Sequence, residues 1–120
     1  MAKFVTIGYG DQDGYDRTDA AIRDEAHAQD ARLLEAGATV GIAGSPVQVR
    51  NPDGAGATVE SGSFLSSALP VAGFAIIEAA TLEEAAQLVS KTPCAVARGV
   101  VEVWPLQEPS GPAALHLPAR

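Results

Sequence analysis

Apolar and polar residues follow two spacings along this chain, and the two spacings predict different elements. Residues 3–9 alternate with a period of two and are rich in β-branched and aromatic side chains, which predicts a strand covered on both faces. Residues 22–33 follow the period of a helix, with one face made of Ile22, Ala26, Gln29 and Leu33. The chain therefore combines strands with helices.

The first helix carries a start signal and a stop signal. The polar residues 11–17 are expected to form a loop, which leads to Thr18 or Asp19 as the N-cap of the helix. Gly37 suits the left-handed position that follows a helix, so the helix is expected to end near Ala36.

Short apolar runs and turn residues divide the middle of the chain. In chain order they predict a strand at 38–44, its continuation beyond a bend at 47–50, a turn at 51–56 and a returning hairpin arm at 57–60. The longest apolar run, residues 71–78, predicts a central strand.

A second helix and a last strand complete the pattern. Thr81 and Glu84 have the spacing of a capping box, and the apolar positions after Thr81 recur with helical spacing. Pro93 is expected to close this helix. Residues 99–106 predict the final strand, with Pro105 ending the regular structure.

The element order β-α-β-β-α-β, with an extra hairpin between the helices, predicts an α+β fold of ferredoxin-like architecture. Both helices would cover one face of the sheet. The other face carries apolar side chains, so a second subunit is expected to cover it in a sheet-to-sheet homodimer. Residues 1–106 are expected to form one domain, and residues 107–120 a proline-rich tail that is either a loose arm or a segment docked on a partner.

Composition supports a small core. Apolar residues make up 47% of the 120 residues but aromatic residues only 5%, so Val, Ile, Leu and Ala must fill the interior. Such a thin core gains stability when a sheet face is buried against a second copy.

Charge and cysteine content narrow the functional classes. Fifteen carboxylates against eight basic residues give a net charge of −7, which argues against binding to nucleic acid or to an anionic membrane surface. The carboxylates concentrated in residues 11–35 are expected to form a solvated helix face. Because Cys94 is the sole cysteine and residues 1–10 lack the pattern of a secretion signal, a cytoplasmic location is expected.

Several segments resemble the YCII-related family, in particular its DGPF-type branch. The resemblance is best over residues 73–85 and continues through Pro93, Arg98-Gly99 and residues 101–105. Tyr9-Gly10-Asp11 is similar to the end of the family's first strand, and Gly44-Ser45-Pro46 to the loop after its second strand. In all, the resemblance covers residues 3–106.

The motif that names this branch is altered here. Ser61-Gly62-Ser63-Phe64 stands where the family has Asp-Gly-Pro-Phe, so the acid and the proline are absent. The resemblance implies a dimeric α+β barrel with a pocket between helix and sheet and, for some relatives, roles in degrading chlorinated aromatics or in accessory steps on small organic molecules. It also implies a catalytic histidine–carboxylate pair, whose histidine matches His27, and pocket positions at Tyr9, Ser45, Ser61 and Phe64.

His27 is the leading candidate for chemistry from the residues alone. A histidine can take and give a proton near neutral pH. Asp30 follows at i+3 on the same helix face, so its carboxylate is expected to orient the ring and to stabilise the charged form. The alternative is a histidine on a solvated helix face. Asp11 is expected either to supply a second carboxylate at the sheet edge or to serve as a turn residue.

Two functions from different classes remain open. In the first, His27 and a carboxylate transfer a proton on a cyclic or carbonyl-bearing small molecule in a lyase, isomerase or hydrolytic step. In the second, a non-catalytic dimer binds a small ligand or acts as an accessory module, and His27 is incidental. Neither function implies an organic cofactor, and the spacing of the His and Cys residues predicts no metal site.

Overall fold

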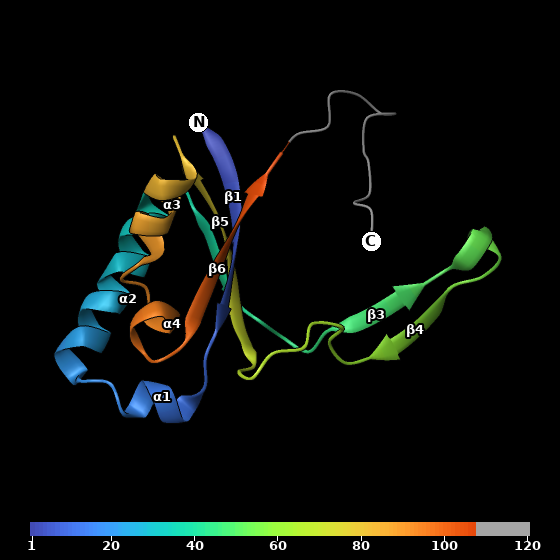
Figure 1. Cartoon of the computed structure of the whole chain (residues 1–120), viewed down its shortest axis with the longest axis horizontal. Coiled ribbons are helices and arrows are strands. Elements are labelled where there is room, and N and C mark those ends of the chain that lie inside the picture. Colours follow the sequence, from blue (N-terminus) through green and yellow to red (C-terminus); the bar gives the residue numbers. More distant parts are fainter. Residues whose placement is uncertain (108–120) are drawn as a thin grey trace.

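A four-stranded antiparallel sheet with helices on one face forms the body of the protein in the computed structural model, which describes residues 1–107 (Figure 1). Its strands, from one edge to the other, are β2 (Thr39–Ile42), β5 (Val71–Ala79), β1 (Ala2–Tyr9) and β6 (Val100–Leu106). The helices are α1 (Gln12–Asp16), α2 (Ala20–Glu35), α3 (Leu82–Val89) and α4 (Pro93–Val96). This mixed α+β arrangement is compatible with a ferredoxin-like fold.

Strand register separates the two faces of the sheet. Phe4 of β1 lies opposite Ile77 of β5, and both side chains are buried beneath the helices. Together with Ala79, Ala85 and Val89 they form the hydrophobic core. The core is small and rich in alanine, as the composition predicts.

The boundaries of α2 agree with the sequence signals. The side chain of Asp19 accepts a hydrogen bond from the backbone N–H of Ala21, and Gly37 has a left-handed φ of 103° directly after the helix. The Gln29 side chain donates to the carbonyl oxygen of Leu88 at 2.7 Å, which joins α2 to α3. The Thr81 hydroxyl accepts from the N–H of Glu84 and starts α3, as predicted.

Three local predictions were wrong. Residues 11–17 are not a loop, because Asp11 accepts a hydrogen bond from the Gly14 N–H and caps the short helix α1. Pro93 begins α4 and does not close α3, since proline fits the first helical turn, where its missing N–H has no helical partner. Pro105 lies within β6, where the edge position of the strand tolerates it.

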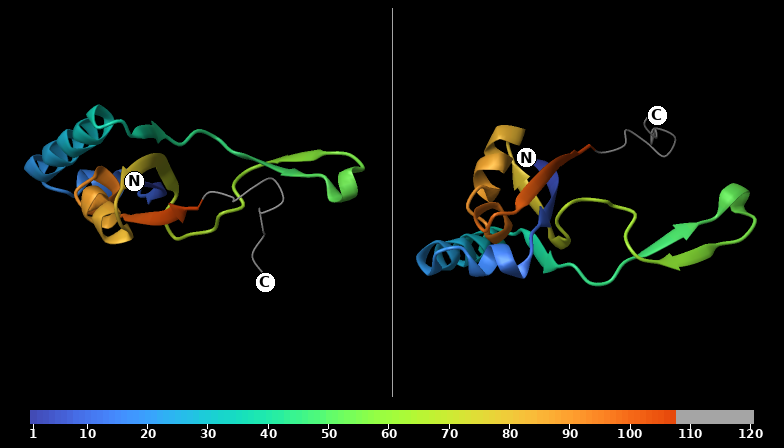
Figure 2. Two further views of the ribbon diagram at one scale, coloured as in Figure 1. Left: turned by 90° about the horizontal axis from the view of Figure 1, so that it is seen from above. Right: turned by 60° about the horizontal axis from the view of Figure 1, so that its bottom comes forward.

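Residues 47–61 leave the body of the molecule. β3 (Val47–Arg50) pairs with β4 (Thr58–Ser61) in a separate two-stranded sheet, and the 3-10 turn η1 (Pro52–Gly54) lies between them. β3 is therefore not a continuation of β2. Both views in Figure 2 show this hairpin, here called the arm, extending away from the sheet.

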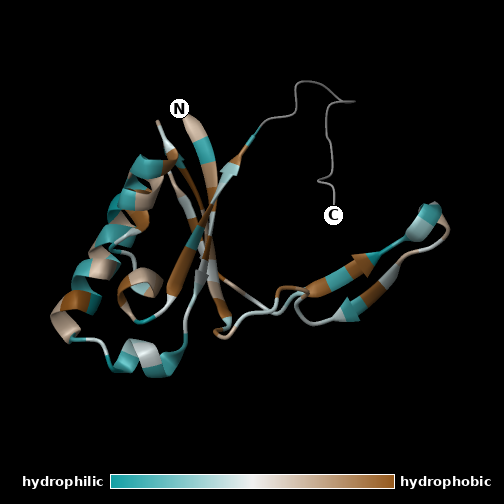
Figure 3. Cartoon of the chain, viewed as in Figure 1, coloured by the Kyte–Doolittle hydropathy of each residue, from teal (hydrophilic) through white to brown (hydrophobic). Residues whose placement is uncertain are grey.

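The sheet face opposite the helices is called the open face. It includes the exposed apolar side chains of Phe74, Ile76, Val100, Trp104 and Leu106. Hydrophobic residues recur along the strands of the sheet, as the brown segments in Figure 3 show. Within residues 1–107, no helix combines the length and the apolar character that crossing a bilayer requires. The predicted tail lies, beyond residue 107, outside the described residues.

Candidate functional site

A cavity of about 590 Å³ lies between α2 and the sheet and is called the α2 cavity. His27, Asp30 and Leu33 of α2 form one wall, and strands β1, β2 and β5 provide the sheet side. Val89 and residues 92–94 also line it. Most of the lining is apolar, and its polar side chains are Thr6, His27, Asp30, Thr92 and Cys94.

Close packing of α4 on β1 shapes one end of the α2 cavity. A side chain at Gly8 would place its Cβ 2.9 Å from Sγ of Cys94, which is closer than two such atoms can lie. Glycine at this position therefore lets α4 approach the strand and brings Cys94 to the cavity. His27 and Asp30 reach the same cavity because residues three apart share a helix face.

The His27 ring is held by a residue that the sequence analysis did not single out. Its Nε2 atom lies 2.7 Å from the hydroxyl oxygen of Tyr15, and the two rings are tilted by 59°. The Arg23 guanidinium lies 4.9 Å from the centre of the Tyr15 ring, a cation–π contact. His27 itself is exposed, so its ring reaches both the cavity and solvent. Tyr15, rather than Asp30, makes the hydrogen bond that orients the ring.

Asp30 is the partly buried acid of the α2 cavity. Loss of hydration raises the pKa of its carboxyl group above the ordinary value of 3.8, while attraction to His27 lowers it in part. Burial, followed by repulsion from Asp30, also raises the pKa of the Cys94 thiol. At neutral pH the thiol is therefore protonated and a weak nucleophile, whereas the Asp30 carboxylate is a stronger base than an ordinary aspartate.

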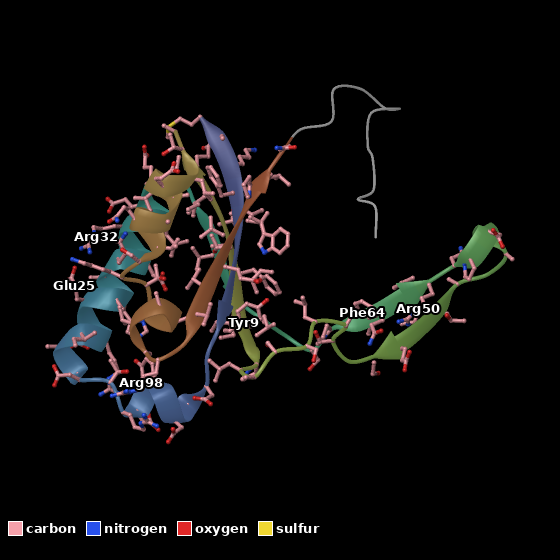
Figure 4. The ribbon with its side chains drawn as sticks, in the orientation of Figure 1. Tyr9, Glu25, Arg32, Arg50, Phe64 and Arg98 are labelled. Atoms are coloured by element: carbon pink, nitrogen blue, oxygen red, sulfur yellow. The ribbon has the colours of Figure 1, made fainter. Side chains whose placement is uncertain are left out.

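The structure does not bring the other predicted pocket residues into this cavity. Asp11 caps α1, in agreement with its alternative role as a turn residue. Ser45 is exposed between β2 and β3, and Ser61 is exposed at the end of β4. Phe64 is 81% exposed beside the arm, with its ring centre 5.8 Å from the Arg50 guanidinium (Figure 4).

Tyr9 belongs to the open face. Its hydroxyl donates to a carboxylate oxygen of Glu102 at 2.7 Å, and the indole N–H of Trp104 reaches the same oxygen at 3.3 Å. The hydrogen bond to Glu102, together with burial and the negative charge of that carboxylate, raises the pKa of Tyr9. Tyr9 is therefore a neutral hydrogen-bond donor that satisfies a carboxylate on an apolar surface.

The described part of the chain holds no cluster of side chains that could form a metal centre. Within residues 1–107, no three His, Cys, Asp or Glu side chains gather closely enough to hold an ion.

Comparison with known protein families gives a match over most of the chain. A family model described as the YCII-related domain matches residues 2–109, a span that includes every strand and helix described above. No curated protein matches the chain.

Proposed function

Because the chain belongs to the YCII-related domain family, we propose that its α2 cavity binds a small organic molecule and transfers a proton on it. Asp30 and His27 form the acid–base pair. The observation that carries this proposal is the position of Asp30: a partly buried carboxylate with a raised pKa on the wall of a mainly apolar cavity, next to a histidine that also meets solvent. We also propose that the chain belongs to the DGPF-type branch of this family, because the altered motif retains Gly62 and Phe64.

Each residue of the pair has a separate task. Asp30 takes a proton from a carbon next to a carbonyl group, and the electron pair of that C–H bond moves toward the carbonyl oxygen. The proton returns to carbon when the double bond reforms, so nothing is oxidised or reduced. His27 stabilises the Asp30 charge and exchanges protons with water at the cavity mouth, while Tyr15 fixes the orientation of its ring.

The lining favours a neutral ligand. A carboxylate on the ligand would meet Asp30 in a poorly hydrated site, and this repulsion opposes binding. A cyclic ketone or enone with an apolar body would instead contact Leu33, Val40 and Val89 and present its acidic C–H group to Asp30.

Hydrogen–deuterium exchange on candidate ligands tests this activity without knowledge of the natural substrate. We expect the protein in D₂O to speed deuterium incorporation next to the carbonyl of at least one compound in a panel of small cyclic ketones and enones, as followed by NMR. Asp30→Asn should slow that incorporation about 100-fold or more, because general base catalysis typically contributes 10² to 10⁴. Binding, followed by shifts of cavity amide signals, should change only a few fold.

Asp24→Asn is the matched control, because it removes the same charge from an exposed position of the same helix. It should leave exchange unchanged. Ligand-induced shifts of cavity residues without any deuterium incorporation would replace catalysis with the non-catalytic binding function, for which the exposure of His27 is the supporting observation. An absence of both shifts and exchange across the panel would contradict the proposal.

A stability measurement gives a second prediction about Asp30. Its raised pKa means that the folded chain holds this proton more tightly than the unfolded chain. The protonated carboxyl group therefore favours folding at low pH, and that contribution disappears as pH rises from the ordinary value through the folded pKa. We expect Asp30→Asn to be as stable as wild type at low pH and more stable at neutral pH, as measured by urea unfolding. A variant that loses stability at neutral pH would contradict the unfavourable burial of this charge.

A further inference from the structure

Thr6 brings a hydroxyl group to the sheet side of the α2 cavity. Of the strand residues that the structure describes around this cavity, only Thr6 has a polar side chain. It lies two residues after Phe4, which is buried beneath the helices, and alternation along the strand turns both side chains the same way. Thr6 is only 4% exposed. The cavity floor is therefore apolar apart from one hydroxyl.

The hydroxyl of Thr6 differs from the other buried threonine hydroxyls. That of Thr18 donates to the carbonyl oxygen of Gly14 at 2.8 Å. That of Thr92 donates to the carbonyl oxygen of Val89 at 2.7 Å. Within residues 1–107 the Thr6 hydroxyl makes no such bond, although every fully enclosed polar side-chain atom there has a partner. Its oxygen is therefore not enclosed by protein, and it opens on the cavity that Thr6 lines.

Small neighbours keep this hydroxyl uncovered. Ala75 lies opposite Thr6 on β5, and the next pair on the same face is Gly8 with Gly73. All three residues line the α2 cavity, and none has a side chain that could cover the hydroxyl or bond to it. They leave a shallow patch on the sheet beside Thr6. A small ring can lie on this patch with one edge at the hydroxyl.

The chain would lose nothing in packing if valine replaced Thr6. Valine has nearly the same shape and also favours strands. A hydroxyl that is withdrawn from most of its water without a protein partner opposes folding. Asp30, on the helix wall of the same cavity, supplies a hydrogen-bond acceptor, so the Thr6 hydroxyl adds a donor on the facing side. A ligand with an acceptor oxygen would give this donor its partner.

We propose that the Thr6 hydroxyl donates a hydrogen bond to the carbonyl oxygen of the ligand, and that the ligand is a small cyclic ketone whose ring lies on Gly8 and Gly73. This inference rests on the proposed function, in which Asp30 takes a proton from the carbon next to that carbonyl. Negative charge grows on the carbonyl oxygen during that step, and a donor placed at the oxygen stabilises it. Thr6 thus holds the carbonyl oxygen from the floor while Asp30 meets the adjacent C–H group from the wall.

Two ligands of similar shape test the role of Thr6. Cyclohexanone has a carbonyl oxygen, whereas methylenecyclohexane has a CH₂ group in its place and accepts no hydrogen bond. We expect Thr6→Val to weaken cyclohexanone binding about 3- to 10-fold, the value of one hydrogen bond, as followed by shifts of cavity amide signals. Binding of methylenecyclohexane should not weaken. The infrared C=O stretch of bound cyclohexanone should lie at lower frequency in wild type than in Thr6→Val.

Urea unfolding separates this role from a structural one. Thr6→Val removes no bond within the protein, so it should unfold at the same urea concentration as wild type or at a higher one. Thr18→Val is the matched control, because it removes a buried hydroxyl that is bonded and lies outside the cavity lining. It should unfold at a lower concentration and bind cyclohexanone as wild type does. Thr6→Ser keeps the hydroxyl and should keep most of the affinity.

Equal affinity of wild type and Thr6→Val for cyclohexanone would overturn the proposal. A loss of stability in Thr6→Val as large as in Thr18→Val would also overturn it, because the hydroxyl would then have a protein partner. A wild-type protein that binds neither compound would contradict the assignment of a cyclic ketone, while the exchange panel decides the proposed function separately. If cyclohexanone bound through Thr6 without deuterium exchange, the role of Thr6 would stand and catalysis by Asp30 would fall.

Discussion

Ile77→Ala should lower the free energy of unfolding by about 4 kcal/mol, near the upper part of the range for such a change in a core. Ile77 is 2% exposed and is the largest side chain that the helices and the sheet bury completely. Two of its core neighbours, Ala79 and Ala85, are alanines. Their side chains are too short to move into the space left behind, so the cavity stays open. The free energy of unfolding then falls by the full cost of that cavity.

Ile76 provides the matched control. It is the neighbouring residue on the same strand, has the same chemistry, and lies 43% exposed on the open face. Urea unfolding of both alanine variants would compare the contributions of the two sheet faces to stability. Ile76→Ala should then cost less than about 1.5 kcal/mol. If Ile77→Ala and Ile76→Ala lost equal amounts of unfolding free energy, the sheet would not have one buried and one open face.

Elements with a strong period were predictable from the sequence. β1, β5 and α3 each carry a run of apolar residues whose spacing matches the element. α2 buries only Ala26 and Leu33 of its predicted stripe, and caps such as Asp19 and Thr81 mark where the helices begin. Because these signals are local, tertiary packing did not change them.

The elements that the sequence did not reveal depend on contacts from elsewhere in the chain. α1 has five residues and no apolar stripe, and its backbone packs closely at Gly14, where an added Cβ would lie 2.6 Å from the carbonyl oxygen of Ala97. Pro93 can either end one helix or begin another, and local sequence does not decide between the two. β3 is separate from β2 because it pairs with a different strand. Strand pairing depends on distant parts of the chain, so local sequence does not predict it.

The candidate site was likewise predictable only where local sequence determines it. The spacing of His27 and Asp30 placed both residues on one wall of the α2 cavity, because helix geometry is local. Tyr15, Thr6 and Cys94 reach His27 or the cavity from three other elements. The signal that could have identified Tyr15 is its position on a short helix capped by Asp11, where the polar sequence predicts a loop.

Gly99→Ala is the second substitution for which we expect a large loss of stability, about 3 kcal/mol. Gly99 lies where the chain turns from α4 into β6, and its N–H donates to the carbonyl oxygen of Cys94 at 3.0 Å. A Cβ at this position would lie 2.7 Å from that same oxygen and would also collide with the carbonyl oxygen of Tyr9. Both obstacles are backbone atoms, so no side-chain rotation relieves the clash.

Relief requires α4 to move away from β1, and this links the substitution to the α2 cavity. Thr92, Pro93 and Cys94 would shift together, so Gly99→Ala should also weaken ligand binding in the cavity. Gly44→Ala is the matched control, since an added Cβ there meets no atom within 4 Å and its φ lies outside the left-handed region. That variant should unfold within about 0.5 kcal/mol of wild type. If Gly99→Ala unfolded at the same urea concentration as Gly44→Ala, the close packing of α4 on the sheet would be wrong, and with it the shape of the cavity that His27 and Asp30 line.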